Sequence, residues 1–145
     1  MHLPDTSINL LPVIAAAVLN MAIGMLWYSP FVLGKLWIKS MGPGQAGKTS
    51  GEFQQSGSAN PLIYVFNTIA ALIFAYVLAH IMKFAFISSF GDGVIVGFWV
   101  WLGFVVTTVL PGYLYEKRSK VLYFIFILYQ LVAICLMGGL LAIWK

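Results

Sequence analysis

The sequence predicts an all-α integral membrane protein, a four-helix bundle with a short interfacial amphipathic helix after the first span. Composition is the first observation: 8% of the residues are charged and 61% are hydrophobic, whereas soluble domains average about 25% charged and 45–50% apolar residues. A soluble fold would leave much of that apolar surface exposed. The second observation is that the apolar stretches are long, because about 20 residues are needed to cross about 30 Å of hydrocarbon.

Four stretches reach that length within what we expect to be a single transmembrane domain covering residues 1–145. The expected spans are roughly residues 8–28, 61–82, 94–115 and 121–144, and residues 29–60 connect the first two. The chain starts without the charged region and cleavage site of a secretory signal, so the first span is expected to stay in the mature protein. Between the second and third spans, Gly91-Asp92-Gly93 is typical of a turn.

The end of the first span carries a membrane-interface motif. Trp27 and Tyr28 are residue types that settle at the level of the lipid headgroups. Pro30 ends the helix, because the residue before a proline is pushed out of the α region. Beyond it, apolar residues that include Trp37 share one side while Lys35 and Lys39 reach toward lipid phosphates. This pattern predicts a short helix lying in the interface.

The basic residues predict the orientation. Six of the eight lie in the first and third connections, namely Lys35, Lys39, Lys48, Lys117, Arg118 and Lys120. The positive-inside rule therefore predicts that these connections are cytoplasmic and that both termini are outside, which in a bacterium is the periplasmic side of the inner membrane. Anionic lipid is a better partner for these flanking charges than nucleic acid. In the third connection, the cytoplasmic turn, Glu116 is expected either to pair with Arg118 or to reach Lys35 or Lys39 of the interfacial helix.

Each span also carries small or polar residues at four-residue spacing, which places them on one helix face. One polar residue in each span falls roughly 9–14 Å from the cytoplasmic end, at 1.5 Å per residue. We expect these residues to form an intramembrane polar layer: Asn20, Asn67, Thr107 and Gln130. The favoured interpretation is an interhelical clasp, because all four are neutral. The alternative is a binding site or pathway for a polar molecule.

Other patterns indicate no chemistry. Residues 42–49 match the phosphate-loop pattern GxxxxGK[ST], but the buried strand and following helix that such a loop requires are not predicted. His80 is interpreted as an interfacial hydrogen-bonding group rather than a haem or metal ligand. The acids fall in termini or connections, which argues against a proton-coupled transporter. We therefore expect no cofactor, no metal and no catalytic residues.

Several short motifs resemble a known family. These are Asn20 with Gly24, the WYSP of residues 27–30, Gly34-Lys35 with Trp37, Gly91-Asp92-Gly93, the WLGF of residues 101–104, and Glu116 with Arg118-Ser119. Together they resemble the bacterial and fungal family called domain of unknown function 1761. The resemblance implies a small four-helix membrane protein and no assigned activity. It also implies an Asn where Gly112 stands and a His where Gln130 stands, and these departures favour a structural role.

The leading functional expectation is a non-catalytic structural or accessory subunit of a homo-oligomer or a larger membrane complex. Its expected partners are the bilayer with its anionic lipids, and further copies of the chain or other membrane subunits. A small transporter or channel with a neutral polar pathway is the alternative. A lipid- or quinone-modifying enzyme is a distant third, because no general base is visible in the sequence.

Overall fold

A computed structural model of the chain describes residues 7–29, 31–40, 61–116 and 119–144. These residues form α1 (Leu10–Trp27), α2 (Gly34–Ser40), α4 (Pro61–Phe84), α5 (Phe90–Val100), the π-helical turn η1 (Trp101–Val106), α6 (Thr107–Tyr115) and α7 (Lys120–Ile143). Helices α5, η1 and α6 form one continuous helical segment. Within the described part of the chain, four helical segments are long and apolar enough to cross a bilayer, which confirms the predicted fold class.

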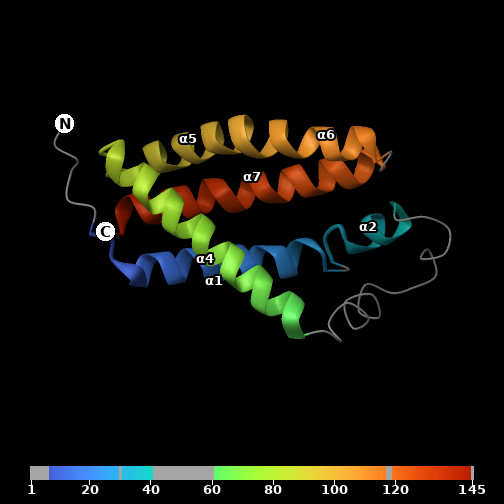
Figure 1. Ribbon diagram of the computed structural model, residues 1–145, viewed down its shortest axis with the longest axis horizontal. Helices are drawn as coiled ribbons and strands as arrows, with labels where there is room; N and C mark the ends of the chain where they lie inside the picture. The colour runs from blue at the N-terminus through green and yellow to red at the C-terminus, as the bar shows by residue number, and fades with distance from the viewer. Residues whose placement is uncertain (1–6, 30, 41–60, 117–118, 145) are drawn as a thin grey trace.

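Helix α7 is the axis of the bundle. Figure 1 shows α7 lying between α1 and the α5–α6 segment, while α4 crosses the others obliquely and diverges from α6 toward its own first turn. The most extensive helix contact joins α5 to α7, and α1 packs against both α4 and α7. The bundle is therefore closed at one end and spread at the other.

Small residues fill the core at the closed end. Ala16, Ala71 and Ala75 are buried there beside the larger side chains of Leu78 and Met137. Small side chains let transmembrane helices approach closely, and the close approach provides the van der Waals contact that holds them together in lipid. The predicted small faces of the first and second spans therefore point into the bundle.

Gly93 of α5 and Gly138 of α7 form a close helix contact. A Cβ atom built on Gly93 would lie 2.4 Å from the carbonyl oxygen of Gly138. Gly91-Asp92-Gly93 was expected to form a turn, and this expectation is wrong. The hydroxyl of Ser89 accepts a hydrogen bond from the backbone N–H of Asp92 and caps α5, which begins at Phe90. A serine N-cap stabilises the helix start, so Gly93 serves helix packing instead.

The third span contains a π-helical turn that its sequence does not predict. Residues 101–106 form the π-helical turn, where each turn holds more residues than in an α-helix. The turn changes the register of everything that follows. In this span the residues at four-residue spacing are Gly103, Thr107 and Pro111, which were expected to face inward. They are exposed instead, and a Cβ on Gly103 would meet nothing within 4 Å.

We predict that Gly93→Ala destabilises the bundle. The new methyl group would press against backbone atoms of α7 that cannot move independently, and overpacking of this kind costs about 1–3 kcal/mol. The matched control is Gly112→Ala, because a Cβ at Gly112 has open space around it. Thermal unfolding in detergent, followed by circular dichroism, should show a lower midpoint for Gly93→Ala alone. Equal midpoints for the two variants would contradict this packing account.

Candidate intramembrane binding site

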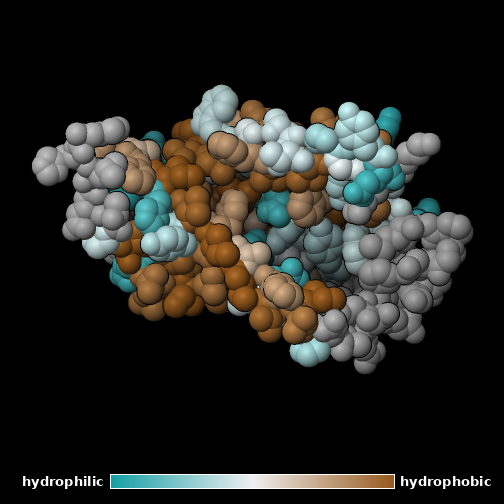
Figure 2. All heavy atoms as spheres, viewed as in Figure 1, coloured by the Kyte–Doolittle hydropathy of each residue, from teal (hydrophilic) through white to brown (hydrophobic). Residues whose placement is uncertain are grey.

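A cavity of about 640 Å³ lies among α1, α4, η1, α6 and α7. Cavities of about 300–1,000 Å³ are typical of sites for small molecules. Figure 2 shows this face of the molecule hollowed where α4 diverges from α6, with polar residues visible at the bottom of the hollow between apolar rims. The cavity therefore opens sideways, toward the surface that lipid would cover.

Three of the four residues expected to form the polar layer line this one cavity. They are Asn20 from α1, Asn67 from α4 and Gln130 from α7. Thr107 is not among the lining residues, and its hydroxyl donates to the carbonyl of Gly103 on the exposed face, at 2.6 Å. Thr108 lines the cavity instead. The π-helical turn explains the exchange, because it rotates the start of α6 relative to an uninterrupted α-helix.

Asn20 is held by a partner from α7. The hydroxyl of Tyr129 donates to Oδ1 of Asn20 at 2.7 Å. Gly24, one turn further along α1, makes room for this tyrosine, because a Cβ there would lie 3.2 Å from the tyrosine hydroxyl. The Asn20 and Gly24 pair is therefore explained by the tyrosine ring that fits over it. This contact is an interhelical clasp of the kind expected from the sequence.

The other two amides have no such partner. Within the described residues, neither the side-chain amide of Asn67 nor that of Gln130 makes a hydrogen bond to protein. Gln130 is half-buried beside the clasp, and Asn67 is exposed on the diverging part of α4. The expected layer is thus divided: one amide is paired inside the protein, and two remain available to a molecule in the cavity.

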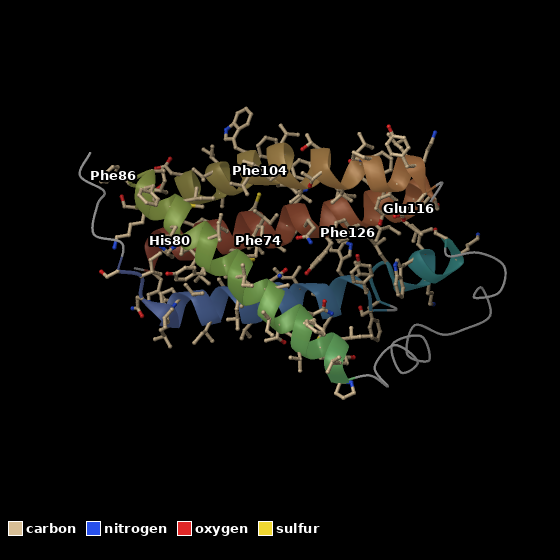
Figure 3. All side chains as sticks on the ribbon, viewed as in Figure 1. Phe74, His80, Phe86, Phe104, Glu116 and Phe126 are labelled. Carbon is tan, nitrogen blue, oxygen red and sulfur yellow. The ribbon has the colours of Figure 1, made fainter. Side chains whose placement is uncertain are left out.

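Aromatic side chains line much of the remaining wall. Tyr28 makes edge contacts with Tyr129 and with Trp37 of α2, at ring-centroid distances of 5.8 and 5.3 Å. Figure 3 labels three phenylalanines that line the cavity and come from α4, η1 and α7, namely Phe74, Phe104 and Phe126. The lining contains no Asp, Glu, Lys, Arg or His among the described residues. The site therefore combines neutral hydrogen-bonding groups with aromatic surface.

The interface motif lies at one end of this cavity. The indole Nε1 of Trp27 donates to the carbonyl of Ile125 in α7 at 3.1 Å, so this side chain ties two helices together. A Cβ on Gly34 would lie 2.5 Å from the carbonyl oxygen of Tyr28, which explains the glycine at the start of α2. Lys35 is exposed. Pro30 lies outside the described residues.

The remaining residues singled out in the sequence lie elsewhere. Glu116 ends α6, and its expected partner Arg118 lies outside the described residues, as does the GxxxxGK[ST] match of residues 42–49. The Nδ1 atom of His80 lies 3.0 Å from the carbonyl of Tyr76, one turn earlier on α4. Among the described residues, no group of three His, Cys, Asp or Glu is placed to hold a metal ion.

Comparison with known proteins adds the family. The family model described as Protein of unknown function (DUF1761) matches residues 11–142, nearly the whole chain. The chain belongs to this family. No curated protein and no solved structure matches it. The resemblance seen in the sequence is thereby confirmed. The family is described as one of unknown function, so the match suggests no activity for this DUF1761 protein.

Sequence reasoning missed Tyr129 and Thr108. Tyr129 precedes Gln130 in an apolar run, and the one signal for it was Gly24, which leaves space on α1 for a large partner. Nothing in the sequence marked Thr108 over Thr107, because the choice between adjacent threonines depends on the π-helical turn. The candidate site in this DUF1761 protein is thus assembled by packing between helices, which the periodicity of a single span does not predict.

We predict that Tyr129→Phe weakens the bundle through loss of the clasp to Asn20. Hydrogen bonds between transmembrane helices contribute about 0.6–2 kcal/mol, so the unfolding midpoint in detergent should fall modestly. Tyr115→Phe is the control, because Tyr115 is 88% exposed. An Asn20→Ala variant should lower stability little further in the Tyr129→Phe background. Additive losses in that double-mutant cycle would show that the two side chains do not interact.

Proposed function

We propose that this DUF1761 protein binds a small neutral amphiphile taken from the bilayer, without changing it chemically. The observation that carries the proposal is the pair of side-chain amides, Asn67 and Gln130, that line one cavity and make no hydrogen bond within the described residues. A bound molecule would provide those bonds. The proposal develops the binding alternative that the sequence left open beside the clasp.

The energetic argument compares the two interpretations. A polar group removed from water without a compensating hydrogen bond costs roughly 2–7 kcal/mol. A clasp avoids this cost by pairing amides across helices, as Asn20 and Tyr129 do. Among the described residues, Asn67 and Gln130 are not paired in this way. Water or a ligand would satisfy them, and the aromatic walls favour a molecule with apolar parts.

The charge of the lining supports a neutral ligand. An anion would need a cation or several backbone N–H groups beside it, and an ammonium group would need a carboxylate or a cage of aromatic faces, because a buried unpaired charge is very costly. The described lining residues supply amides, hydroxyls and aromatic rings. These groups bind and orient a neutral head group, but none is a general base near neutral pH. The geometry therefore favours binding over catalysis.

We predict that the double variant Asn67→Leu/Gln130→Leu loses a co-purifying lipid. Protein extracted with a mild detergent should carry a neutral small-molecule adduct in native mass spectra, and lipid extraction should identify its mass. Loss of two hydrogen bonds should lower occupancy about tenfold or more. Thr107→Val serves as the control, because Thr107 lies outside the cavity lining.

Two outcomes would contradict the binding proposal. One is wild-type protein that carries no adduct under conditions in which the bundle remains folded. The other is equal occupancy in the wild type and the double leucine variant. Circular dichroism on each sample separates loss of ligand from loss of fold, because the leucine side chains replace amides that make no hydrogen bond to described residues.

A structural or accessory subunit is the second candidate. Residues 61–66, the first turns of α4, are all exposed and project away from the rest of the bundle (Figure 1). A neighbouring membrane helix would cover this segment, and the predicted self-association would follow. Native mass spectra of the same mild extracts test it, because heavier complexes support the subunit role and a lone species of 16.0 kDa opposes it.

We also propose that the end of the bundle near Lys120 is cytoplasmic, from the distribution of basic residues. In a Cys135→Ala background, Lys120→Cys should be labelled by a membrane-impermeant maleimide only after the cells are opened. Ser88→Cys, at the other end of the bundle, should be labelled in intact cells once any outer membrane has been made permeable. Both positions are exposed. The reverse labelling pattern would invert the orientation.

A further inference from the structure

Resting on the proposed binding function, we infer that the ligand is a carbonyl-bearing neutral lipid whose head group is a planar ring, a quinone-type lipid. The inference comes from three features of the cavity: the direction of its hydrogen-bond donors, the aromatic character of its walls, and its sideways opening. Each feature restricts a different part of the ligand.

The hydrogen-bond donors restrict the polar atoms of the head group. Because Oδ1 of Asn20 accepts from Tyr129, the NH₂ group of Asn20 is the part of that amide left for the cavity. Asn67 and Gln130 each bring a further amide, whose NH₂ carries two donors and whose oxygen accepts. Because the oxygen of Asn20 is already engaged, donor hydrogens outnumber the amide oxygens that remain, and this excess suits a ligand with carbonyl acceptors. A carbonyl oxygen has two lone pairs, so it can accept from two of them.

The aromatic walls restrict the shape of the head group. Tyr129 lies between Tyr28 and Phe126, at ring-centroid distances of 5.8 and 6.4 Å, and all three rings line the cavity. Aromatic rings pack favourably against one another in offset or edge-on arrangements. A flat conjugated ring gains this contact, whereas the flexible backbone of a glycerol ester does not. The wall therefore favours carbonyl groups carried on a ring.

The opening restricts the rest of the molecule. Phe104 of η1 lines the cavity and is 69% exposed, so it lies at the rim between the polar floor and the lipid-facing surface. Phe74 of α4 borders the cavity from the opposing helix (Figure 3). An apolar tail attached to the ring can leave between α4 and η1 and remain in the hydrocarbon. The cavity volume of about 640 Å³ thus needs to hold the head group and the start of the tail.

The test titrates the full-length protein in mild detergent with a decyl-substituted benzoquinone, its reduced quinol under anaerobic conditions, and dioleoylglycerol. Native mass spectrometry counts bound molecules, and competition with the endogenous adduct shows whether they share a site. We expect saturable binding of one quinone, with the quinol about fivefold weaker, because a phenolic hydroxyl oxygen accepts from the NH₂ group of Asn20 less well than a carbonyl oxygen does. Dioleoylglycerol should bind more weakly still.

The variants link the binding to the cavity. Asn67→Leu/Gln130→Leu should weaken quinone binding about tenfold or more, while Thr107→Val should leave it unchanged. Quinol binding as tight as quinone binding, or quinone binding unaffected by the leucine variant, would overturn the inference. If dioleoylglycerol bound most tightly, the carbonyl group of the ligand would belong to an ester, and the inference of a planar ring head group would be overturned.

The two proposals fail in different ways. An endogenous adduct that depends on Asn67 and Gln130, combined with no binding of the quinone, would leave the binding function standing and overturn the quinone-type ligand. A cavity that binds neither an endogenous adduct nor any of the three probes would overturn both. Binding of the quinone with displacement of the endogenous adduct supports both.

Discussion

Hydrocarbon supplies no hydrogen bonds, and this constraint accounts for most of the polar contacts in the bundle. The indole groups of Trp27 and Trp101 donate to backbone carbonyls of α7, and the hydroxyl of Tyr123 donates from α7 to the carbonyl of Val106 in η1. Each of these three side chains thereby joins one helix to another. Against this pattern, the side-chain amides of Asn67 and Gln130 differ, because they line a cavity and make no hydrogen bond to the described residues.

Side-chain size changes along the bundle. At the closed end the facing residues are small, so that Gly93 meets Gly138 and alanines of α1 and α4 are buried between helices. Toward the other end aromatic residues face one another, and Tyr28 contacts Tyr129 there. Helix α4 diverges from α6 toward this second end (Figure 1). Small residues thus accompany the closed end, and aromatic residues line the cavity at the spread one.

Composition and span length were sufficient to predict the number of helices and their class, because the cost of exposing apolar surface in water leaves few alternatives. Helical periodicity also predicted that Asn20, Asn67 and Gln130 would face a common space. The prediction failed at Thr107, because helical periodicity assumes a regular α-helix and the π-helical turn interrupts it. This turn coincides with a contact between helices, the hydrogen bond from Trp101 to the carbonyl of Ile127. The turn preference of glycine and aspartate failed at Gly93, because a glycine in a turn and a glycine in a helix contact look alike in sequence.

The interface motif and the cavity form one packing unit. Trp37 of the surface helix α2 contacts Tyr28, Tyr28 contacts Tyr129, and Tyr129 holds the amide of Asn20. Gly34 is required where α2 begins, because any side chain there would meet the end of α1. Helix α2 is therefore joined by direct contacts to the polar floor of the cavity. Through these contacts the glycines and aromatic rings of residues 20–29 and 31–37 set the position of the Asn20 amide at the cavity wall, and under the proposed function they are part of the binding site.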